Sequence, residues 1–329
     1  MKIAVVGATG LVGSEMLKIL MEQGFQDYTV IACASENSVG KEISLGDKRI
    51  KVLSVTDTLA AKPEFALFSA GGEISKQLAP QFVENGTCVI DNSSAWRMDP
   101  NVPLIVPEIN ADQIKGARLI ANPNCSTIQL VMVLNPLHQI WGLRRIILST
   151  YQSVTGSGKK AVDQLLGERM GKSPEKFYPW PIDLNCIPHC DVFLENGYTR
   201  EEMKLVNESR KILSIPELQV SATAVRVPVV GGHSISVNAE FQNSISAVEA
   251  RIQLTQSPGL KVWDDPTLNQ YPMPILSQNN DWVWVGRIRA DESQVNTLNL
   301  WITADNLRKG AATNAVQILQ YCLTEYGTA

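Results

Sequence analysis

The sequence lacks long apolar runs and has no excess of basic residues. No stretch of its 329 residues reaches the roughly 18–20 consecutive apolar residues that a membrane-spanning helix needs. Lysine and arginine together number 29 against 33 aspartates and glutamates, a formal net charge of −4. This balance gives no support for nucleic acid or another polyanion as a partner. We therefore expect an ordinary soluble globular protein, with no membrane association.

The features of a secreted protein are also missing. Glycine interrupts the opening residues, MKIAVVGATG, whereas a signal peptide has an unbroken apolar region. Six cysteines in a chain of this length do not suggest a disulfide framework. We expect a protein of the reducing cytoplasm.

A glycine-rich turn stands between the first predicted strand and the first predicted helix. Residues 3–6 are a continuous apolar run, as in a buried parallel strand, residues 7–13 read GATGLVG, and residues 14–21 have helical apolar spacing. In a dinucleotide-binding fold such glycines place a pyrophosphate on the helix N-terminus. Glycine-rich turns also serve plain helix–strand packing, but this position favours a nucleotide.

The remaining patterns predict two domains, since the chain exceeds the usual size of one hydrophobic core. Strands are expected over 28–34, 65–70 and 87–91, with a helix over 75–85, which indicates a parallel, doubly wound sheet. Later strands (145–152, 219–230, 235–241, 282–288, 297–303) and helices (160–170, 201–213, 247–255) predict a mixed α+β second domain. A last helix over 309–326 is expected to return to the first domain.

Residues 122–127 read NPNCST and place Cys125 at a predicted helix start. Asparagine or serine ahead of the apolar run 128–134 is a helix-start signal. The free N–H groups and positive dipole end of such a terminus stabilise a thiolate, the reactive form of cysteine. Cys125 is therefore a candidate nucleophile. The alternative is a buried structural thiol.

His233 is one of only three histidines, and it follows two glycines at the start of a predicted strand. Histidine is the side chain best suited to move a proton near neutral pH, although a structural histidine is the alternative. Arg226, seven residues earlier, can present a planar fork to a carboxylate or form a surface ion pair.

Other candidates have weaker local signals. Glu201 and Lys204 lie three residues apart on a predicted helix, hence on one face, where a solvated surface pair is the alternative. Arg97 follows a predicted strand end as a candidate anion binder, and nothing local marks Gln152. Residues 186–190 read CIPHC, but a zinc site usually needs a second ligand pair, so we expect no metal.

Taken together, the motifs resemble those of the aspartate-β-semialdehyde dehydrogenase family. The resemblance runs the whole length and includes GATGLVGSEML, LFSAGG, DNSSAWRM, NPNCSTIQ, STYQSVTGSG, YTREEMK, RVPVVGGHS and DNLRKGAA. It implies an α/β fold with an N-terminal Rossmann-like dinucleotide-binding domain, residues 1–126 with 308–329. A mixed α+β catalytic and dimerisation domain, residues 127–307, would form a homodimer.

The resemblance also implies residue roles. Cys125 matches the thiol that forms an acyl-enzyme thioester, His233 the acid/base, and Gln152 a substrate-orienting catalytic residue. The implied substrate contacts are Arg226 to the α-carboxylate, Glu201 to the α-amino group, Lys204 and Arg97 to phosphate, and Asn124. The implied cofactor contacts are Gly7, Thr9, Gly10, Leu11, Val12, Ser35, Asn37, Ser38, Gly71, Thr155, Gly156 and Asn306.

One segment departs from the family pattern. Relatives often read S-x-R-S-x-G-K after the second strand, with the arginine on the 2′-phosphate of NADP, whereas this chain has Asn37 there. Ser35, Ser38 and Lys41 remain suited to a phosphate, but Glu36 would repel one and suits a ribose hydroxyl. NADP is expected from the family, with NAD open.

The implied reaction is reversible reduction of L-aspartyl 4-phosphate to L-aspartate 4-semialdehyde and phosphate. It serves lysine, diaminopimelate, threonine and methionine biosynthesis. In the oxidative direction Cys125 attacks the aldehyde while His233 takes the proton, and phosphate then displaces the thioester. Two alternatives are a reductase of another acyl phosphate, such as N-acetylglutamyl phosphate, and a catalytically silent nucleotide-binding paralogue.

Overall fold

The computed structural model describes residues 1–326, which form two compact units. One unit contains Met1–Pro123 and the described residues from Ala311 on, and the other contains Asn124–Gly310. The sequence places these crossings after residues 126 and 307. In the structure residues 124–126 and 308–310 belong to the second unit. Residues 125 and 126 lie there as the first residues of helix α5 (Cys125–Trp141).

The first unit contains a seven-stranded sheet in the order β3-β4-β2-β1-β5-β6-β7. Its strands are β1 (Lys2–Val6), β2 (Thr29–Cys33), β3 (Glu42–Leu45), β4 (Lys48–Leu53), β5 (Phe65–Phe68), β6 (Cys88–Asp91) and β7 (Leu119–Ala121). All neighbouring pairs are parallel except β3 with β4. The strand order reverses between β1 and β5, the place where open α/β sheets bind ligands.

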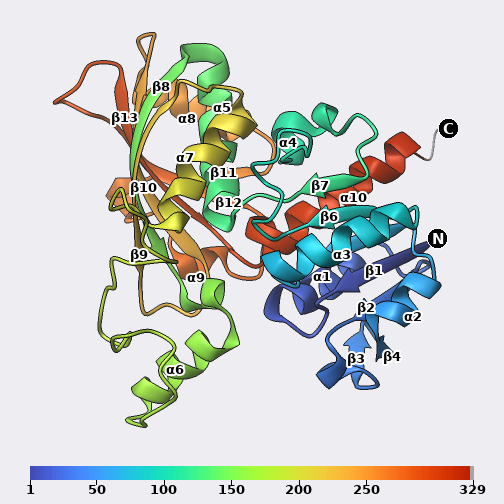
Figure 1. Cartoon of the computed structure of the whole chain (residues 1–329). Coiled ribbons are helices and arrows are strands. Elements are labelled where there is room, and N and C mark those ends of the chain that lie inside the picture. The colour runs from blue at the N-terminus through green and yellow to red at the C-terminus, as the bar shows by residue number, and fades with distance from the viewer. Residues whose placement is uncertain (327–329) are drawn as a thin grey trace. The chain divides into compact units, whose positions relative to one another are not determined.

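Helices cover both faces of this sheet (Figure 1). They are α1 (Leu11–Glu22), α2 (Val55–Ala60), α3 (Gly72–Glu84), α4 (Pro107–Asn110) and α10 (Thr313–Tyr326). Successive residues of a strand face opposite sides, so Ile3 and Val5 point to one core and Ala4 and Val6 to the other. The parallel, doubly wound sheet predicted from the sequence is confirmed.

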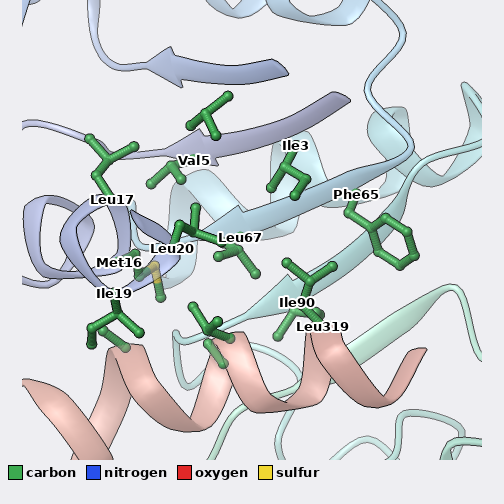
Figure 2. Packing of buried hydrophobic residues seen from close by; sticks show 14 of the residues in the cluster. Ile3, Val5, Met16, Leu17, Ile19, Leu20, Phe65, Leu67, Ile90 and Leu319 are labelled. Atoms are coloured by element: carbon green, nitrogen blue, oxygen red, sulfur yellow. The ribbon is translucent and has the colours of Figure 1, made fainter. Parts of the chain in front are cut away.

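Figure 2 shows how one of these cores is filled. Side chains of α1 and α10 meet those of β1, β5 and β6 in one apolar layer, with Leu20 and Leu319 both buried. Burying such a side chain contributes roughly 1.5–3 kcal/mol. The expected return of the last helix to the first domain is therefore confirmed.

The second unit contains a six-stranded mixed sheet in the order β11-β12-β13-β10-β8-β9. Its strands are β8 (Leu143–Gln152), β9 (Gln219–Arg226), β10 (His233–Phe241), β11 (Leu260–Val262), β12 (Val283–Ala290) and β13 (Thr297–Ala304). Its helices are α5, α6 (Lys159–Arg169), α7 (Arg200–Leu213), α8 (Ala247–Gln256) and α9 (Pro274–Ser277). The predicted mixed α+β architecture is confirmed.

The register of this sheet gathers three candidate residues at one end. The last residue of β8, Gln152, pairs with the last residue of β9, Arg226. Strand β10, beside β8, begins at His233 at the same end, since Ser234 pairs with Tyr151. The predicted strand over 219–230 stops at Arg226 because Pro228 has no N–H to donate.

The last helix is preceded by a short π-helix, Arg308–Ala312, which the sequence does not predict. Among the described residues, no helix is long and apolar enough to cross a membrane.

Candidate active site

The glycine-rich turn of the first unit has the geometry that a pyrophosphate needs. Gly7 has φ +87°, and a Cβ there would overlap the carbonyl of Ser69 at the end of β5. A Cβ at Gly13 would overlap the carbonyl of Gly7, so glycine lets α1 begin directly against the turn. The N-cap of α1 is Gly10, which supplies no side-chain cap. The first-turn N–H groups therefore remain available to an anion.

The other predicted cofactor residues of this unit also lie at strand ends. Thr9, Gly10, Leu11 and Val12 form the passage from β1 into α1. Ser35 and Asn37 are exposed just after β2, where Glu36–Ser38 form a 3-10 turn. Gly71 has φ +86° and is the N-cap of α3.

Arg97 is buried in the first unit. Its Nε donates to the carbonyl of Asn122 at 2.9 Å and its Nη2 to the carbonyl of Asn92 at 2.8 Å. The loop that carries it is tied to Asp91, whose carboxylate accepts from the Ser93 N–H at 2.6 Å and from the Ser75 hydroxyl. The guanidinium is thus held by fixed backbone acceptors.

In the second unit, Asn124 caps the helix that begins at Cys125. Its Oδ1 accepts from the N–H groups of Ser126 at 2.9 Å and Thr127 at 3.2 Å. Its own N–H donates to the buried Glu208 carboxylate at 2.7 Å. Cys125, partly buried, is the first helical residue and forms no disulfide. The predicted helix start at the cysteine is confirmed.

Gly310 lies directly against the cysteine. A Cβ at this glycine would lie 3.1 Å from the Cys125 Cβ, which is closer than an ordinary contact between carbon atoms. The π-helix therefore passes Cys125 at a point where a larger residue would press on it.

Glu201 connects the predicted substrate residues. Its Oε1 accepts from Asn124 Nδ2 at 2.9 Å and from Gln152 Nε2 at 3.2 Å. Its Oε2 lies 2.9 Å from Lys204 Nζ, which also lies 2.9 Å from Asp191. Glu201 is buried, so the surface-pair alternative is wrong, while the shared helix face is confirmed. Burial, the largest single effect, raises the pKa of Glu201, but the Lys204 ammonium, the hydrogen bond from Asn124 and the charge of Arg226 together outweigh it and lower that pKa to about 2.

Arg226 and His233 meet beside Gly156. Both side chains are buried, which rules out a surface ion pair for the arginine. Arg226 Nη1 donates to the carbonyl of Ser153 at 2.7 Å. A Cβ at Gly156 would lie 3.0 Å from His233 Nε2 and 3.3 Å from Arg226 Nη1. Glycine here leaves both nitrogens facing the same backbone.

The electrostatic surroundings keep His233 neutral. Burial, aided by the positive charge of Arg226, lowers the pKa of its imidazole to about 3, against the opposing effect of the Glu201 carboxylate. Among the described residues, neither His233 Nε2 nor Arg226 Nε has a hydrogen-bond partner. Buried polar atoms without partners are uncommon in native proteins, so these two nitrogen atoms are suited to a ligand.

Asn306 joins the loop around Thr155 to the start of β10. Its Oδ1 accepts from Ser153 Oγ at 3.0 Å, from Thr155 Oγ1 at 3.2 Å and from the Gly232 N–H at 3.2 Å. This amide therefore fixes the glycine that precedes His233.

The structure also places in this site residues to which the sequence analysis gave no role there. Cys190 is buried, and burial raises the pKa of its thiol to about 12, with Arg226 opposing and Glu201 and Cys125 adding to the rise. Ser153 contacts His233 and Glu208 contacts Asn124. In the sequence, Ser153 could have been noticed because it directly follows Gln152. Nothing in the sequence around Glu208 points to a role in this site.

The candidate residues thus form two groups. The second unit brings together Cys125, Asn124, Gln152, Glu201, Lys204, Arg226, His233, Thr155, Gly156 and Asn306. The glycine-rich turn, residues 35–38, Gly71 and Arg97 belong to the first unit. In the described chain, no cluster of three or more His, Cys, Asp or Glu side chains is arranged to hold a metal ion.

Comparison with known proteins identifies the family. Residues 2–117 match the family described as semialdehyde dehydrogenase, NAD binding domain, and residues 134–309 match semialdehyde dehydrogenase, dimerisation domain. Aspartate-semialdehyde dehydrogenase of Aquifex aeolicus is 47% identical, with 98% of each chain covered. This chain belongs to the aspartate-semialdehyde dehydrogenase family.

Other relatives agree over the full length. Aspartate-semialdehyde dehydrogenase of Legionella pneumophila is 45% identical, covering 99% of this chain and 96% of the relative. The crystal structure of aspartate semialdehyde dehydrogenase II from Vibrio cholerae complexed with ASA superposes with a TM-score of 0.94 at 41% identity, covering 99% and 98% of the chains. The predicted family is confirmed, and with it the two-domain α/β plan.

Proposed function

We propose that this chain reversibly converts L-aspartyl 4-phosphate and reduced NADP to L-aspartate 4-semialdehyde, phosphate and oxidised NADP through a cysteine thioester. The observation that carries this proposal is the position of Cys125 at the first turn of α5, with its cap residue bonded to Glu201. A helix N-terminus lowers the pKa of a thiol and stabilises negative charge beside it. Full-length similarity to named relatives supports the substrate.

Cys125 supplies the nucleophile. Its thiolate attacks the substrate carbonyl and divides one difficult displacement into two easier ones. When bound, the nicotinamide cofactor accepts or donates the hydride. The turn around Gly7, whose missing Cβ brings backbone close to backbone, is suited to hold the pyrophosphate of that cofactor.

The substrate's amino-acid end is matched by buried groups of opposite charge. Arg226, fixed through Nη1 by the Ser153 carbonyl, keeps other N–H groups for the α-carboxylate. Glu201, ionised because its pKa lies near 2, is suited to the α-ammonium group. Gln152 and Asn124 both donate to Glu201 and hold its carboxylate in place.

For the phosphate we propose Arg97 and Lys204. Arg97 is oriented by two backbone carbonyls, and positioned cations stabilise a phosphoryl group electrostatically. Lys204 is already shared between Glu201 and Asp191, which leaves one ammonium hydrogen for phosphate.

For the cofactor we propose NADP, with Thr155, Gly156 and Asn306 near its nicotinamide end. The exposed Ser35, Asn37 and half-buried Ser38 after β2 are suited to the 2′-phosphate, although Glu36 opposes it. Rates with NADP and NAD measured side by side test this choice. We expect faster turnover with NADP than with NAD, and a lower KM for NADP in Asn37→Arg than in the wild type. Turnover with NAD that equals or exceeds that with NADP would overturn the choice of NADP.

We further propose a cytoplasmic homodimer that serves the biosynthesis of lysine, diaminopimelate, threonine and methionine. The match to the dimerisation domain over residues 134–309 supports the homodimer, and the similarity to named aspartate-semialdehyde dehydrogenases supports the biosynthetic role. Light scattering of the full chain tests the oligomer, and a monomeric mass at working concentration would contradict it.

Replacement of Cys125 by alanine tests the central step. Phosphate-dependent reduction of the cofactor by aspartate semialdehyde is expected to disappear in Cys125→Ala, while the variant keeps its folded circular-dichroism spectrum. The same assay with N-acetylglutamate semialdehyde tests the alternative reaction, in which the acyl phosphate is N-acetylglutamyl phosphate. Activity that persists in Cys125→Ala, or wild-type activity that is higher with the acetylated substrate, would overturn the proposal. A wild-type chain that is inactive with both substrates would instead support a catalytically silent nucleotide-binding paralogue.

A further inference from the structure

Glu208 is a buried carboxylate to which the proposed reaction gives no role. It lies in the second half of α7 and is only 1% exposed. Its Oε2 accepts from the main-chain N–H of Asn124 at 2.7 Å. Taking a carboxylate out of water is costly unless hydrogen bonds replace those that water made. The bond that Glu208 accepts is to the residue directly before the proposed nucleophile, Cys125.

Glu208 shares a face of α7 with two residues that we propose to bind the substrate. Glu201, Lys204 and Glu208 follow one another at spacings of three and four residues, which places them in one row along a helix. This helix begins with a capping box, packs beside α5 and buries Leu205 and Ile212 (Figure 1). The packed helix α7 is thus a common support for the three polar side chains.

Asn124 is held by this face of α7 at two points. Its main-chain N–H donates to Glu208 at 2.7 Å, and its side-chain Nδ2 donates to Glu201 at 2.9 Å. Its Oδ1 meanwhile accepts from the first N–H groups of α5. The two carboxylates therefore hold both the backbone and the side chain of the residue before Cys125.

The bond to Glu208 acts on the main chain, where a displacement passes directly to the next residue. Peptide groups are planar, so the N–H plane of Asn124 is joined to that of Cys125 through one pair of φ and ψ angles. A small rotation of this plane moves the cysteine sulfur as well. A displacement of about 1 Å at a reacting group can cost about 10²-fold in rate.

We propose that Glu208 is a positioning residue for the reaction. By holding the main chain before Cys125, it sets the place of the thiolate relative to Glu201 and Lys204. This inference rests on the proposed function, in which those two residues bind the substrate that Cys125 attacks. Glu208 acts through Asn124 and takes no part in making or breaking bonds.

Two substitutions at Glu208 separate the reach of the side chain from its charge. Glu208→Gln loses the charge and keeps an acceptor oxygen at the same reach. Glu208→Asp keeps the charge and draws the oxygens back by one methylene. If the hydrogen bond positions Cys125, Glu208→Gln should react nearly as fast as the wild type, and Glu208→Asp should react as slowly as Glu208→Ala.

Pre-steady-state kinetics of the full chain separate positioning from folding. Enzyme is mixed with aspartate semialdehyde and NADP without phosphate, and the burst of reduced cofactor is followed. Its amplitude counts correctly folded sites, and its rate constant reports attack and hydride transfer. We expect the rate constant to fall about 10- to 100-fold in Glu208→Asp and Glu208→Ala, and less than about threefold in Glu208→Gln, at unchanged amplitude. A lower amplitude with a normal rate constant, or equal rate constants in Glu208→Gln and Glu208→Ala, would overturn the proposal.

Glu168 offers a matched control in the same unit. Its carboxylate also accepts from main-chain N–H groups, those of Ile182 and Asp183, both at 2.8 Å. Glu168→Ala therefore loses bonds of the same kind that do not involve Asn124. It should leave the rate constant of the burst unchanged, and a fall as large as that in Glu208→Ala would contradict a specific role for Glu208.

Alkylation of Cys125 by iodoacetamide tests the inference without turnover. Glu208→Gln and Glu208→Ala both lack the carboxylate charge, so the difference between them isolates the hydrogen bond. Mass spectrometry of the peptide that contains Cys125 should show alkylation at least about twofold slower in Glu208→Ala at the same pH, because a less firmly held helix start stabilises the thiolate less. Equal rates would defeat the inference alone. A wild type without a burst, but with this difference in alkylation, would defeat the proposed reaction and support the positioning of Cys125 by Glu208.

Discussion

Arg226 is a buried arginine whose side chain is oriented by the protein itself. Its Nη1 donates to the Ser153 carbonyl at 2.7 Å, and its Nε has no partner among the described residues. An arginine fixed in this way loses little side-chain entropy when it binds a carboxylate in its planar fork. We therefore expect the orientation of the guanidinium, as well as its charge, to contribute to substrate binding.

Arg226→Lys tests that statement, because lysine keeps the charge and loses the fork. We expect kcat/KM to fall by roughly tenfold to a hundredfold, equivalent to about 1.5–3 kcal/mol for a hydrogen bond to a charged group. Arg251→Lys, at the ion pair with Asp264 in the same unit, is the matched control and should leave kcat/KM nearly unchanged. Steady-state kinetics of both variants measure this effect. An unchanged kcat/KM in Arg226→Lys would contradict the proposed contact between Arg226 and the α-carboxylate.

Residue types pointed to part of the candidate site and could not point to the rest. Cys125 and His233 were visible because a thiol at a helix start and a histidine after two glycines are unusual. Ser153 was not, because it acts on His233 through a backbone N–H, which every residue except proline has. Cys190 was considered only as a zinc ligand, since nothing in its neighbours along the chain shows that Arg226 and Glu201 surround it.

Among the elements, helix α5 begins with the proposed nucleophile, Cys125, directly after its cap residue, Asn124. Asn124 satisfies two of the N–H groups that any helix leaves without partners, and its amide also reaches Glu201. The cap thus serves both the stability of the helix and the position of Cys125.

Asn124→Ala is expected to lower the free energy of unfolding by about 0.5–2 kcal/mol, the usual cost of losing a cap. It should also slow alkylation of Cys125 by iodoacetamide at a fixed pH. A frayed helix start stabilises the thiolate less, so a smaller fraction of Cys125 is in the reactive form. Ser246→Ala removes the cap of α8 and should cost similar stability without slowing alkylation. Urea unfolding and thiol labelling measure the two effects, and equal labelling rates in both variants would argue against the cap's second role.

Long elements were predictable and short ones were not. Strands β2 and β5, which pair with β1, are continuous apolar runs, and helix α7 has a clear helical apolar period. By contrast, β7 has only three residues and α4 only four. Strands β3 and β4 were missed because their sequences, EISL and KRIKVL, are short, lie largely exposed at the sheet edge and are half polar or charged. The π-helix before α10 contains Gly310, which passes close to Cys125, and a contact between such distant parts of the sequence cannot be read from either segment alone.

For the whole molecule, the buried neutral His233 links stability to pH. Its folded pKa lies near 3 because of burial and Arg226, whereas an unfolded histidine titrates near 6.5. Between these values the unfolded chain binds a proton that the folded chain does not, so stability falls as pH drops through this window.

His233→Gln removes this linkage. The unfolding free energy of the wild type minus that of the variant should therefore decrease as the pH falls from 6.5 toward 3, and stay constant above 7.5. Tryptophan fluorescence during urea unfolding reports mainly on the second unit, which contains every tryptophan except Trp96. Parallel stability curves across this range would mean that His233 titrates normally in the folded protein.

The most direct test of the account is to trap the thioester. The enzyme is mixed with aspartate semialdehyde and NADP without phosphate, and reduced cofactor and acylated peptides are measured. We predict a stoichiometric burst of reduced cofactor, with the aspartyl group on the peptide that contains Cys125 and its release on adding phosphate. A reaction with no burst, or an acyl group on any other residue, would contradict the account.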